Sequence, residues 1–326
     1  MTVQEAKRAL VVALQPTSPT PQLDADCILQ HVLCCDKTQL LLRYGNELTL
    51  AQQQALTAAT ARRKTGLPIA YITGHKEFFG YDFTVSPAVL IPKPDTELLV
   101  ELALAAVEDK RAAHPDAVPT VCDMCTGSGC VGLSLLRALT DAAAECEAAV
   151  SDCRAGGGEC ATQLSLASAS LPALTLADIS AAALTIARTN AKRLLPVAAQ
   201  SNVHVVQTNL FEQIPHIFDI IVTNPPYVPR KEALALLTDG RSEPLLALDG
   251  DVTATGDYSG TTDGLALIRR LVPQAYAHLA SNGVLLMETG EYNAEAAAAL
   301  CEEAGFRAVH IERDLSGQLR VVCACR

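Results

Sequence analysis

The pattern of hydrophobic and polar positions divides the chain into an N-terminal helical part and a longer part in which strands and helices alternate. Apolar residues recur at helical spacing between residues 3 and 64, most clearly from Leu23 to Leu33. Another helical pattern begins at Thr49, which stands three residues before Gln52, the spacing of a capping box. Residues 1–68 are therefore predicted to form a small helical domain.

A change of periodicity follows this domain. From Ile69 to Leu90 the residues favour β-structure, and aromatic side chains gather around Gly80. We interpret residues 69–92 as a β-hairpin linker to a second domain, residues 93–326.

In the second domain, short apolar runs alternate with Ala-rich helical segments, which is typical of βα units and a mostly parallel sheet. The turn around Gly317 is too short for a parallel crossover, so the last two strands should pair antiparallel. The predicted class is α/β, with a seven-stranded, mostly parallel, Rossmann-like sheet. Its strands are predicted at Thr120–Met124, Leu174–Ala177, Val203–Gln207, Asp219–Thr223, Gly283–Met287, Ala308–Glu312 and Arg320–Cys323.

The connection between the first two strands is unusually long. Residues 140–172 include an Ala-rich stretch, Gly156–Gly158 and a Ser/Ala stretch. We predict an insertion on the surface, partly flexible, that takes no part in the chemistry.

Composition and charge narrow the class of protein. With 49% hydrophobic and 19% charged residues, the chain can bury a core, and disorder of the whole chain is excluded. The apolar stretch Ala9–Leu14 is too short for a signal peptide or a membrane span, so a cytoplasmic protein without membrane contact is expected. The net charge of −11 argues against tight nonspecific binding to nucleic acid. The basic cluster Arg62, Arg63 and Lys64 is interpreted as a solvated helix end.

The twelve cysteines favour reduced thiols over a disulfide scaffold, because the chain is long and shows no export signal. Cys122 and Cys125 form a CxxC pair, but no second pair or nearby histidines complete a zinc site. A structural role is favoured for them. Cys146, Cys153 and Cys160 recur every seven residues, and metal binding there is disfavoured as well. No metal is predicted.

A glycine-rich loop follows the first predicted strand. Its glycines permit a tight turn and let a ligand approach the backbone at the carboxyl end of a central strand. Such loops bind NAD, FAD or S-adenosylmethionine in different folds, and a merely structural turn has the same composition. The loop residues are Cys125, Thr126, Gly127, Ser128 and Gly129.

Asp178 ends the second predicted strand. A carboxylate at this position can accept hydrogen bonds from both ribose hydroxyls of an adenosine, although a helix-capping Asp would look the same. The loop and Asp178, one strand apart, together predict a site for an adenosyl cofactor.

The segment Asn224-Pro225-Pro226-Tyr227 directly follows the fourth predicted strand. Two successive prolines give a rigid backbone whose carbonyls are free to face a pocket. The Asn224 side-chain oxygen and the Pro225 carbonyl could grip the two N–H groups of an amide or amino nitrogen, while the Tyr227 ring covers the flat group. A plain turn is the alternative interpretation.

This motif resembles that of amino-type nitrogen methyltransferases of the seven-stranded class. More narrowly, the chain resembles the release-factor glutamine N5-methyltransferase family over nearly its whole length. The segments that carry the resemblance are Gly74–Phe79, Leu90–Glu97, Asn224–Tyr227 and Glu243–Leu248.

The resemblance implies S-adenosylmethionine as cofactor and a glutamine side-chain amide of a peptide chain release factor as acceptor. It implies that Thr126–Gly129 line the methionine part of the cofactor and that Asp178 binds the ribose. Asn209 and Leu210 would flank the adenine, and Asn224–Tyr227 would hold the glutamine. The helical domain would hold the protein substrate.

Three positions depart from the family pattern. Cys125 stands where the family usually has Gly, Asn209 replaces a usual Asp, and Lys93 replaces a usual Arg. Cys125 is expected to narrow the loop. The Asn209 amide oxygen can still accept from an adenine amino group, and Lys93 is expected to lose a bidentate contact.

Other functions share these motifs. A glutamine methyltransferase of a ribosomal protein would carry all of them, and an adenine-N6 methyltransferase of DNA or RNA would grip a similar NH₂ group. A catalytically dead adaptor could keep the fold alone. The acidic charge weighs against the nucleic-acid enzyme, and the intact Asp178 and Asn224–Tyr227 weigh against the adaptor.

Overall fold

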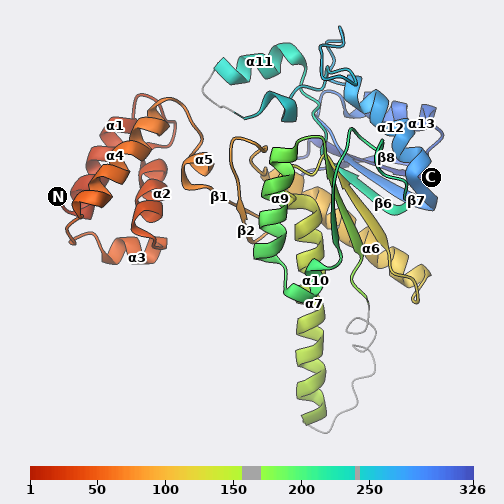
Figure 1. Cartoon of the computed structure of the whole chain (residues 1–326), viewed down its shortest axis with the longest axis horizontal. Coiled ribbons are helices and arrows are strands. Elements are labelled where there is room, and N and C mark those ends of the chain that lie inside the picture. The colour runs from red at the N-terminus through yellow and green to blue at the C-terminus, as the bar shows by residue number, and fades with distance from the viewer. Residues whose placement is uncertain (156–169, 239–242) are drawn as a thin grey trace.

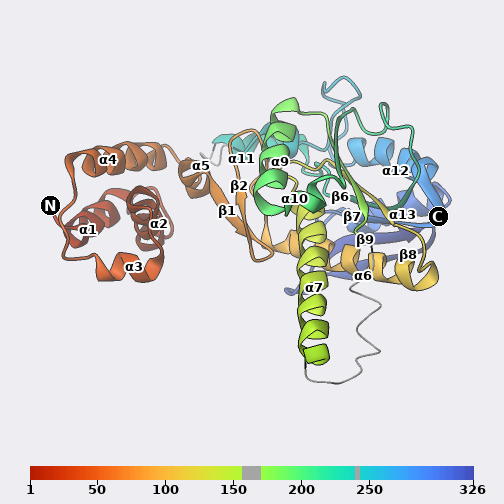
Figure 2. The same cartoon turned by 60° about the horizontal axis from the view of Figure 1, so that its bottom comes forward.

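The computed structural model describes residues 1–155, 170–238 and 243–326, and it shows an N-terminal helical part joined to a larger α/β part (Figure 1). Leu14, Ile28 and Leu29 are fully buried in a core that belongs to the helical part. This part stands apart from the sheet (Figure 2). Its helices are α1 (Val3–Leu14), α2 (Pro21–Leu33), α3 (Lys37–Leu42), α4 (Leu50–Lys64) and the short α5 (Ile69–Thr73).

Local sequence signals fix the starts of these helices. At α4 the Thr49 hydroxyl accepts from the Gln52 amide at 3.2 Å and the Gln52 side chain accepts from the Thr49 amide at 2.9 Å, which confirms the predicted capping box. The interpretation of the basic cluster as a solvated helix end was wrong for Arg63. Its guanidinium lies 2.6 Å from the buried carboxylate of Asp24, which needs a partner.

The predicted hairpin is present as β1 (His75–Phe78) and β2 (Tyr81–Thr84), which pair antiparallel around Phe79 and Gly80. The preceding residues Ile69–Thr73 are helical rather than β-rich. Pro68 stands at the start of this turn of helix, and Gly74 ends it in the left-handed conformation. These two backbone constraints override the β-propensity of the residues between them.

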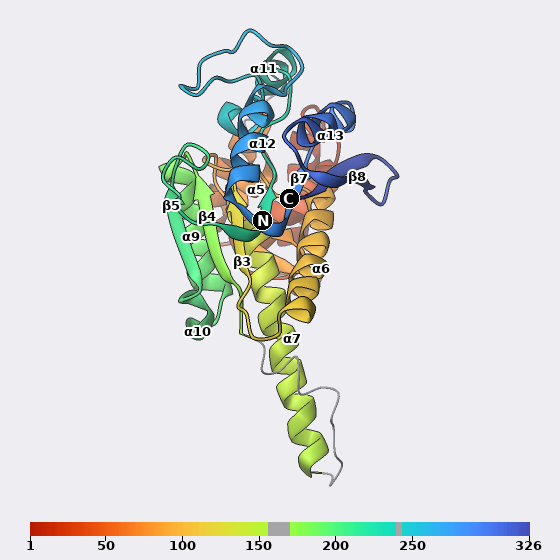
Figure 3. The ribbon, with the colours of Figure 1, turned by 90° about the vertical axis from the view of Figure 1, so that its right-hand side faces the viewer.

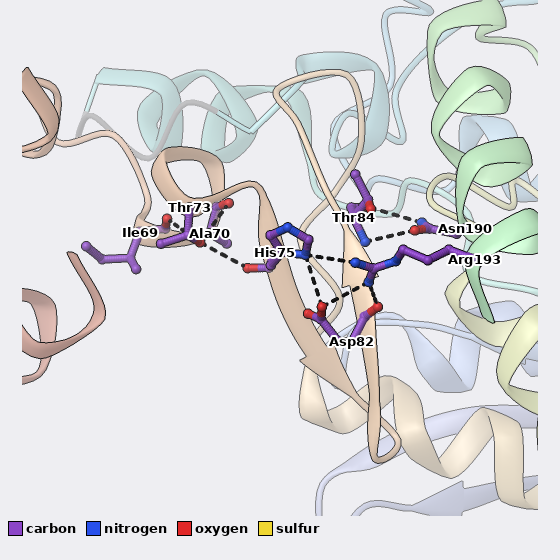
Figure 4. A network of polar contacts seen from close by, with 8 residues as sticks. All are labelled: Ile69, Ala70, Thr73, His75, Asp82, Thr84, Asn190 and Arg193. Carbon is purple, nitrogen blue, oxygen red and sulfur yellow. Dashed lines mark hydrogen bonds and ion pairs between the residues drawn. The ribbon is translucent and has the colours of Figure 1, made fainter. Parts of the chain in front are cut away.

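Polar contacts attach the hairpin to α9 (Ala181–Leu194) (Figure 4). Arg193 lies 3.0 Å from the Asp82 carboxylate, and His75 lies 3.1 Å from the same group. The Asn190 side chain accepts from the Thr84 amide at 2.8 Å and donates to the Thr84 carbonyl at 3.0 Å. The hairpin is thus fixed to the α/β part, and α5 connects the hairpin to the preceding helical part.

The described residues form the predicted seven-stranded sheet, in the order β5-β4-β3-β6-β7-β9-β8. The pairs among the first five strands in this order are parallel. β9 pairs antiparallel with β8, as the short turn predicted, and also with β7. The largest difference from the predicted bounds is at β7, which begins at Leu279 rather than Gly283. The strands are β3 (Thr120–Met124), β4 (Ala173–Asp178), β5 (Val203–Gln207), β6 (Phe218–Thr223), β7 (Leu279–Glu288), β8 (Arg307–Arg313) and β9 (Leu319–Cys325).

Helices cover both faces of the sheet (Figure 3). The remaining helical segments are η1 (Pro94–Thr96), α6 (Glu97–Ala113), α7 (Cys130–Ala155), α10 (Val197–Gln200), α11 (Arg230–Thr238), η2 (Leu245–Ala247), α12 (Ala266–His278) and α13 (Ala294–Glu303). Successive strand residues face opposite sides of the sheet, so Val121 belongs to a hydrophobic cluster with α6, α7 and α9, whereas its neighbour Cys122 belongs to one with α12 and α13. Cys122 is therefore a core residue.

The predicted insertion at residues 140–172 falls partly outside the described residues. Its first part continues α7 to Ala155, so Cys146 and Cys153 lie on this helix, and Cys160 lies outside the described part. Within the described ranges, no helix is both long and apolar enough to cross a membrane.

Candidate active site

A cavity of about 290 Å³ lies where the carboxyl ends of β3, β4, β5 and β6 meet. Parallel strands end at the same edge of a sheet, and this edge is the usual ligand site of open α/β folds. The structure brings most of the predicted site residues to it. Those that line the cavity are Cys125, Thr126, Gly127, Ser128, Asp178, Asn209, Leu210, Asn224 and Pro226.

Three predicted residues do not line the cavity. Gly129 precedes α7, and a Cβ there would lie 2.8 Å from the Leu133 side chain. Pro225 is buried beside the cavity wall. Tyr227 packs against the core on the α12 side, and its hydroxyl donates to Glu288 at 3.2 Å.

The glycine-rich loop turns through left-handed backbone conformations. Gly127 has φ +56°, and a Cβ there would meet nothing within 4 Å, so glycine is needed for the backbone angle rather than for space. Cys125 has φ +60°, a conformation that strains a residue with a side chain. The departure from Gly at this position therefore strains the backbone, in addition to any narrowing of the loop.

Asp178 connects the end of β4 to this loop. Its carboxylate accepts from the Gly127 amide at 2.9 Å and from the Ser180 amide at 2.8 Å. Burial raises the pKa of Asp178, and the two backbone hydrogen bonds oppose that rise. Each carboxylate oxygen keeps a second lone pair, so the group can still accept hydrogen bonds from a ligand in the cavity.

The residues after β5 form the next part of the wall. The Asn209 amide nitrogen donates to Glu212 at 2.8 Å, and its oxygen accepts from Arg270 at 3.2 Å. The Asn209 oxygen therefore already has one partner, and only its second lone pair remains for a ligand. Arg270 also lines the cavity, but it lies on α12 and no motif marked it.

The Asn-Pro-Pro-Tyr corner begins directly after β6. The Asn224 side-chain nitrogen donates to the Thr96 hydroxyl at 3.2 Å, which leaves the side-chain oxygen as the group that can accept from a ligand. Two glycines press against the corner: a Cβ on Gly250 would lie 2.9 Å from the Pro226 oxygen, and one on Gly264 would lie 2.1 Å from the Tyr227 oxygen. The corner is thus held by close backbone contact.

Two of the motif segments meet beside the cavity. The Lys93 ammonium lies 2.9 and 3.1 Å from the two carboxylate oxygens of Glu243, and the Ile91 amide donates to Glu243 at 3.1 Å. The expectation that Lys93 would lose a contact with two oxygens was wrong here. A single ammonium can contact both oxygens because it carries three donors.

Comparison with known proteins identifies the family. A family model described as PrmC N-terminal domain matches residues 3–74, and one described as Methyltransferase small domain matches residues 134–239. The release factor glutamine methyltransferase of Burkholderia pseudomallei is 34% identical to this chain over 97% of it and 96% of its own length. The chain belongs to the release factor glutamine methyltransferase family.

Relatives of this name from other bacteria also align over nearly the full length. The release factor glutamine methyltransferase of Bordetella pertussis is 35% identical and covers 92% of this chain and 93% of its own length. That of Escherichia coli is 32% identical over 98% of each chain. The resemblance inferred from the four motif segments is therefore confirmed.

In this member of the release factor glutamine methyltransferase family, a buried acid supports the glycine-rich loop. Asp123 accepts from the Thr126 hydroxyl at 2.6 Å and from the Gly132 amide at 3.0 Å. Burial raises its pKa from 3.8 to about 7, although these hydrogen bonds oppose the rise. The folded protein thus retains a proton that the unfolded chain releases.

We expect the free energy of unfolding of Asp123→Asn to rise relative to that of the native protein as the pH increases. The stability contributed by protonated Asp123 is fully present below about pH 4 and is lost as the pH rises through about 7, whereas asparagine does not titrate. The difference in free energy of unfolding between the variant and the native protein should change by roughly 4 kcal/mol between about pH 4 and 7. Urea unfolding of both proteins at several pH values measures it, and a pH-independent difference would contradict the prediction.

Proposed function

We propose that this protein transfers a methyl group from S-adenosylmethionine to the side-chain amide nitrogen of a glutamine in a peptide chain release factor. Membership of the family supports the reaction, and the relatives' names do not favour the ribosomal-protein, nucleic-acid or adaptor alternatives. The observation that carries the assignment of the site is the position of Asn224. It lies on the wall of the same cavity as Asp178 and the glycine-rich loop.

The cavity fits the proposed cofactor. Asp178 is suited to accept from the ribose hydroxyls, and the open space at Gly127 admits a ligand close to the backbone. We propose that Cys125–Gly129 hold the methionine part and that Asn209 and Leu210 flank the adenine. Bound there, the cofactor would supply a methyl group already activated by its sulfonium.

The task left to the protein is to position a weak nucleophile. An amide nitrogen reacts poorly because its lone pair is delocalised into the carbonyl. We propose that the Asn224 side-chain oxygen, which lies on the cavity wall, accepts from an N–H group of the substrate amide and so orients the nitrogen. This acceptor would also stabilise the positive charge that develops on the nitrogen. The buried apolar side chains of Val89 and Leu267 on the cavity wall would exclude water.

We further propose that the helical domain, residues 1–68, binds the release factor. Its connection to the cavity supports this role. On α5, Tyr71 donates its hydroxyl to the carbonyl of Val89 at 2.6 Å, and Val89 lines the cavity. The helical part is therefore connected through α5 to a residue of the cavity wall.

A methyl-transfer assay tests the proposed function. The protein is incubated with S-adenosylmethionine that carries an isotopic label on its methyl group, together with a purified release factor. Mass spectrometry of the digested release factor should place the label on one glutamine side chain. A release factor in which that glutamine is replaced by asparagine is the control and should take up no label. Label on a different residue type, or on nucleic acid added in parallel, would overturn the proposal.

A further inference from the structure

Glu288 is a buried acid beside the proposed site that the mechanism above does not use. It ends β7 and is only 2% exposed. One carboxylate oxygen accepts from the Tyr227 hydroxyl at 3.2 Å. The other oxygen is buried and has no hydrogen-bond partner among the residues that the structure describes. Burying a carboxylate with an unpaired oxygen lowers the stability of the folded protein. A buried acid of this kind beside a candidate site therefore indicates a functional role.

Thr96 connects Glu288 to the corner. Its hydroxyl oxygen accepts from the Asn224 side-chain nitrogen at 3.2 Å, and the same hydroxyl lies close enough to the Glu288 carboxyl to lower the pKa of that group. Thr96 stands at the start of α6, where a threonine hydroxyl commonly caps the helix, yet it makes no such bond here. The hydroxyl is thus engaged with Asn224 rather than with the helix, and its proton is available to the unpaired oxygen of Glu288.

We infer that Glu288 is a positioning residue that, through Thr96, fixes which end of the Asn224 side-chain amide faces the cavity. An amide can turn by 180° and exchange its oxygen and nitrogen at almost no cost in shape. When ionised Glu288 accepts the Thr96 proton, the Thr96 oxygen can only accept from Asn224. The Asn224 nitrogen is then directed to Thr96 and its oxygen to the substrate. The orientation of the Asn224 amide does not depend on the proposed function. Only the identity of the group that the Asn224 oxygen binds rests on it.

The charges around Glu288 determine when it is ionised. Burial raises its pKa from 4.5 to about 7, and Asp95 raises it further, while Thr96, Arg320 and Tyr227 oppose the rise. The Cys130 thiol on α7 also interacts electrostatically with it. Above about pH 7 the carboxylate accepts from Thr96, whereas below it the carboxylic acid can itself donate a proton to Thr96. The orientation of Asn224 should therefore be fixed more firmly as the pH rises.

The first test needs no substrate. In ¹⁵N-labelled protein, the side-chain NH₂ signal of Asn224, assigned by its loss in Asn224→Ala, is followed by NMR between about pH 6 and 8. We expect the signal to shift with a midpoint near 7 in the native protein and to stay constant in Glu288→Gln. Thr96→Val should also abolish the shift, whereas Thr96→Ser should keep it. A native signal that does not titrate, or one that titrates unchanged in Glu288→Gln, would overturn the inference.

The second test is kinetic. Thr96→Val and Glu288→Gln should lower kcat at least 10-fold while KM for the release factor and the cofactor Kd stay within a few fold, and Thr96→Ser should retain most of kcat. Thr175→Val on β4 is the matched control, because Thr175 is buried but does not line the cavity. Unchanged kcat in an active enzyme would refute the inference. No methylation of glutamine by the native protein would refute the proposed function, and the NMR test would then decide the inference alone.

Discussion

Asn224→Ala is expected to abolish methyl transfer while the affinity for S-adenosylmethionine stays within a few fold. The substitution removes the side-chain oxygen that we propose grips the acceptor amide, and it leaves Asp178 and the glycine-rich loop in place. Loss of one well-placed polar group that stabilises developing charge typically lowers kcat by about 10²- to 10³-fold. We expect a loss of at least about 100-fold.

The measurement compares kcat for release-factor methylation with the cofactor Kd from calorimetry. Asn202→Ala is the matched control. The Asn202 side chain donates to the Leu171 carbonyl at 3.0 Å. Asn202 lies just before β5, at the amino ends of the parallel strands, whereas the cavity lies at their carboxyl ends. Asn202→Ala should lower the free energy of unfolding and leave kcat unchanged. Full activity of Asn224→Ala would show that the corner does not hold the acceptor.

Asp178→Ala should weaken cofactor binding at least about 100-fold, because two hydrogen bonds to a charged group together contribute roughly 3 to 6 kcal/mol. The variant loses the acceptors proposed for both ribose hydroxyls. It also frees the Gly127 amide, which Asp178 holds at 2.9 Å, so the loop loses its anchor. Calorimetric titration with S-adenosylmethionine measures the effect.

Asp219→Ala serves as the control for this loss. Asp219 on β6 accepts from the amide and the hydroxyl of Thr120 at 2.9 and 2.8 Å, so its removal also breaks two bonds between elements. These bonds lie at the amino ends of β3 and β6, away from the cavity. The control should lower the free energy of unfolding and leave the cofactor Kd unchanged. Equal losses of affinity in both variants would indicate a general effect of destabilisation.

The strands were predictable because their signal is local. Val121, Ile220 and Leu286 stand in short apolar runs that are buried between helices, and such runs are marked in the sequence by length and by flanking turn residues. The antiparallel β9 was predictable from the shortness of the turn before it. By contrast, α5 was missed, since a helix of one turn has too few residues to show a period.

Part of the candidate site was equally predictable. Cys125–Ser128 and Asn224 directly follow strands and Asp178 ends one, so the topology of a parallel sheet brings them to one edge. Residues outside such motifs were not found. Arg270 lies on a helix with an ordinary amphipathic pattern, and Gly250 and Gly264 lie in a loop where glycine is common. Their contact with the site depends on how distant segments pack.

The sequence by itself determined the order of elements, the ligand edge and the family, because each depends on residues close together in the chain. Only the tertiary structure decided which atoms of the site are already engaged. The Asn224 side-chain nitrogen donates to Thr96, which lies 128 positions away in the chain, and we infer that Glu288, 64 positions away, fixes this orientation. Hydrogen bonds act over about 3 Å in space and leave no periodicity in the sequence, so this link became visible only in the folded protein.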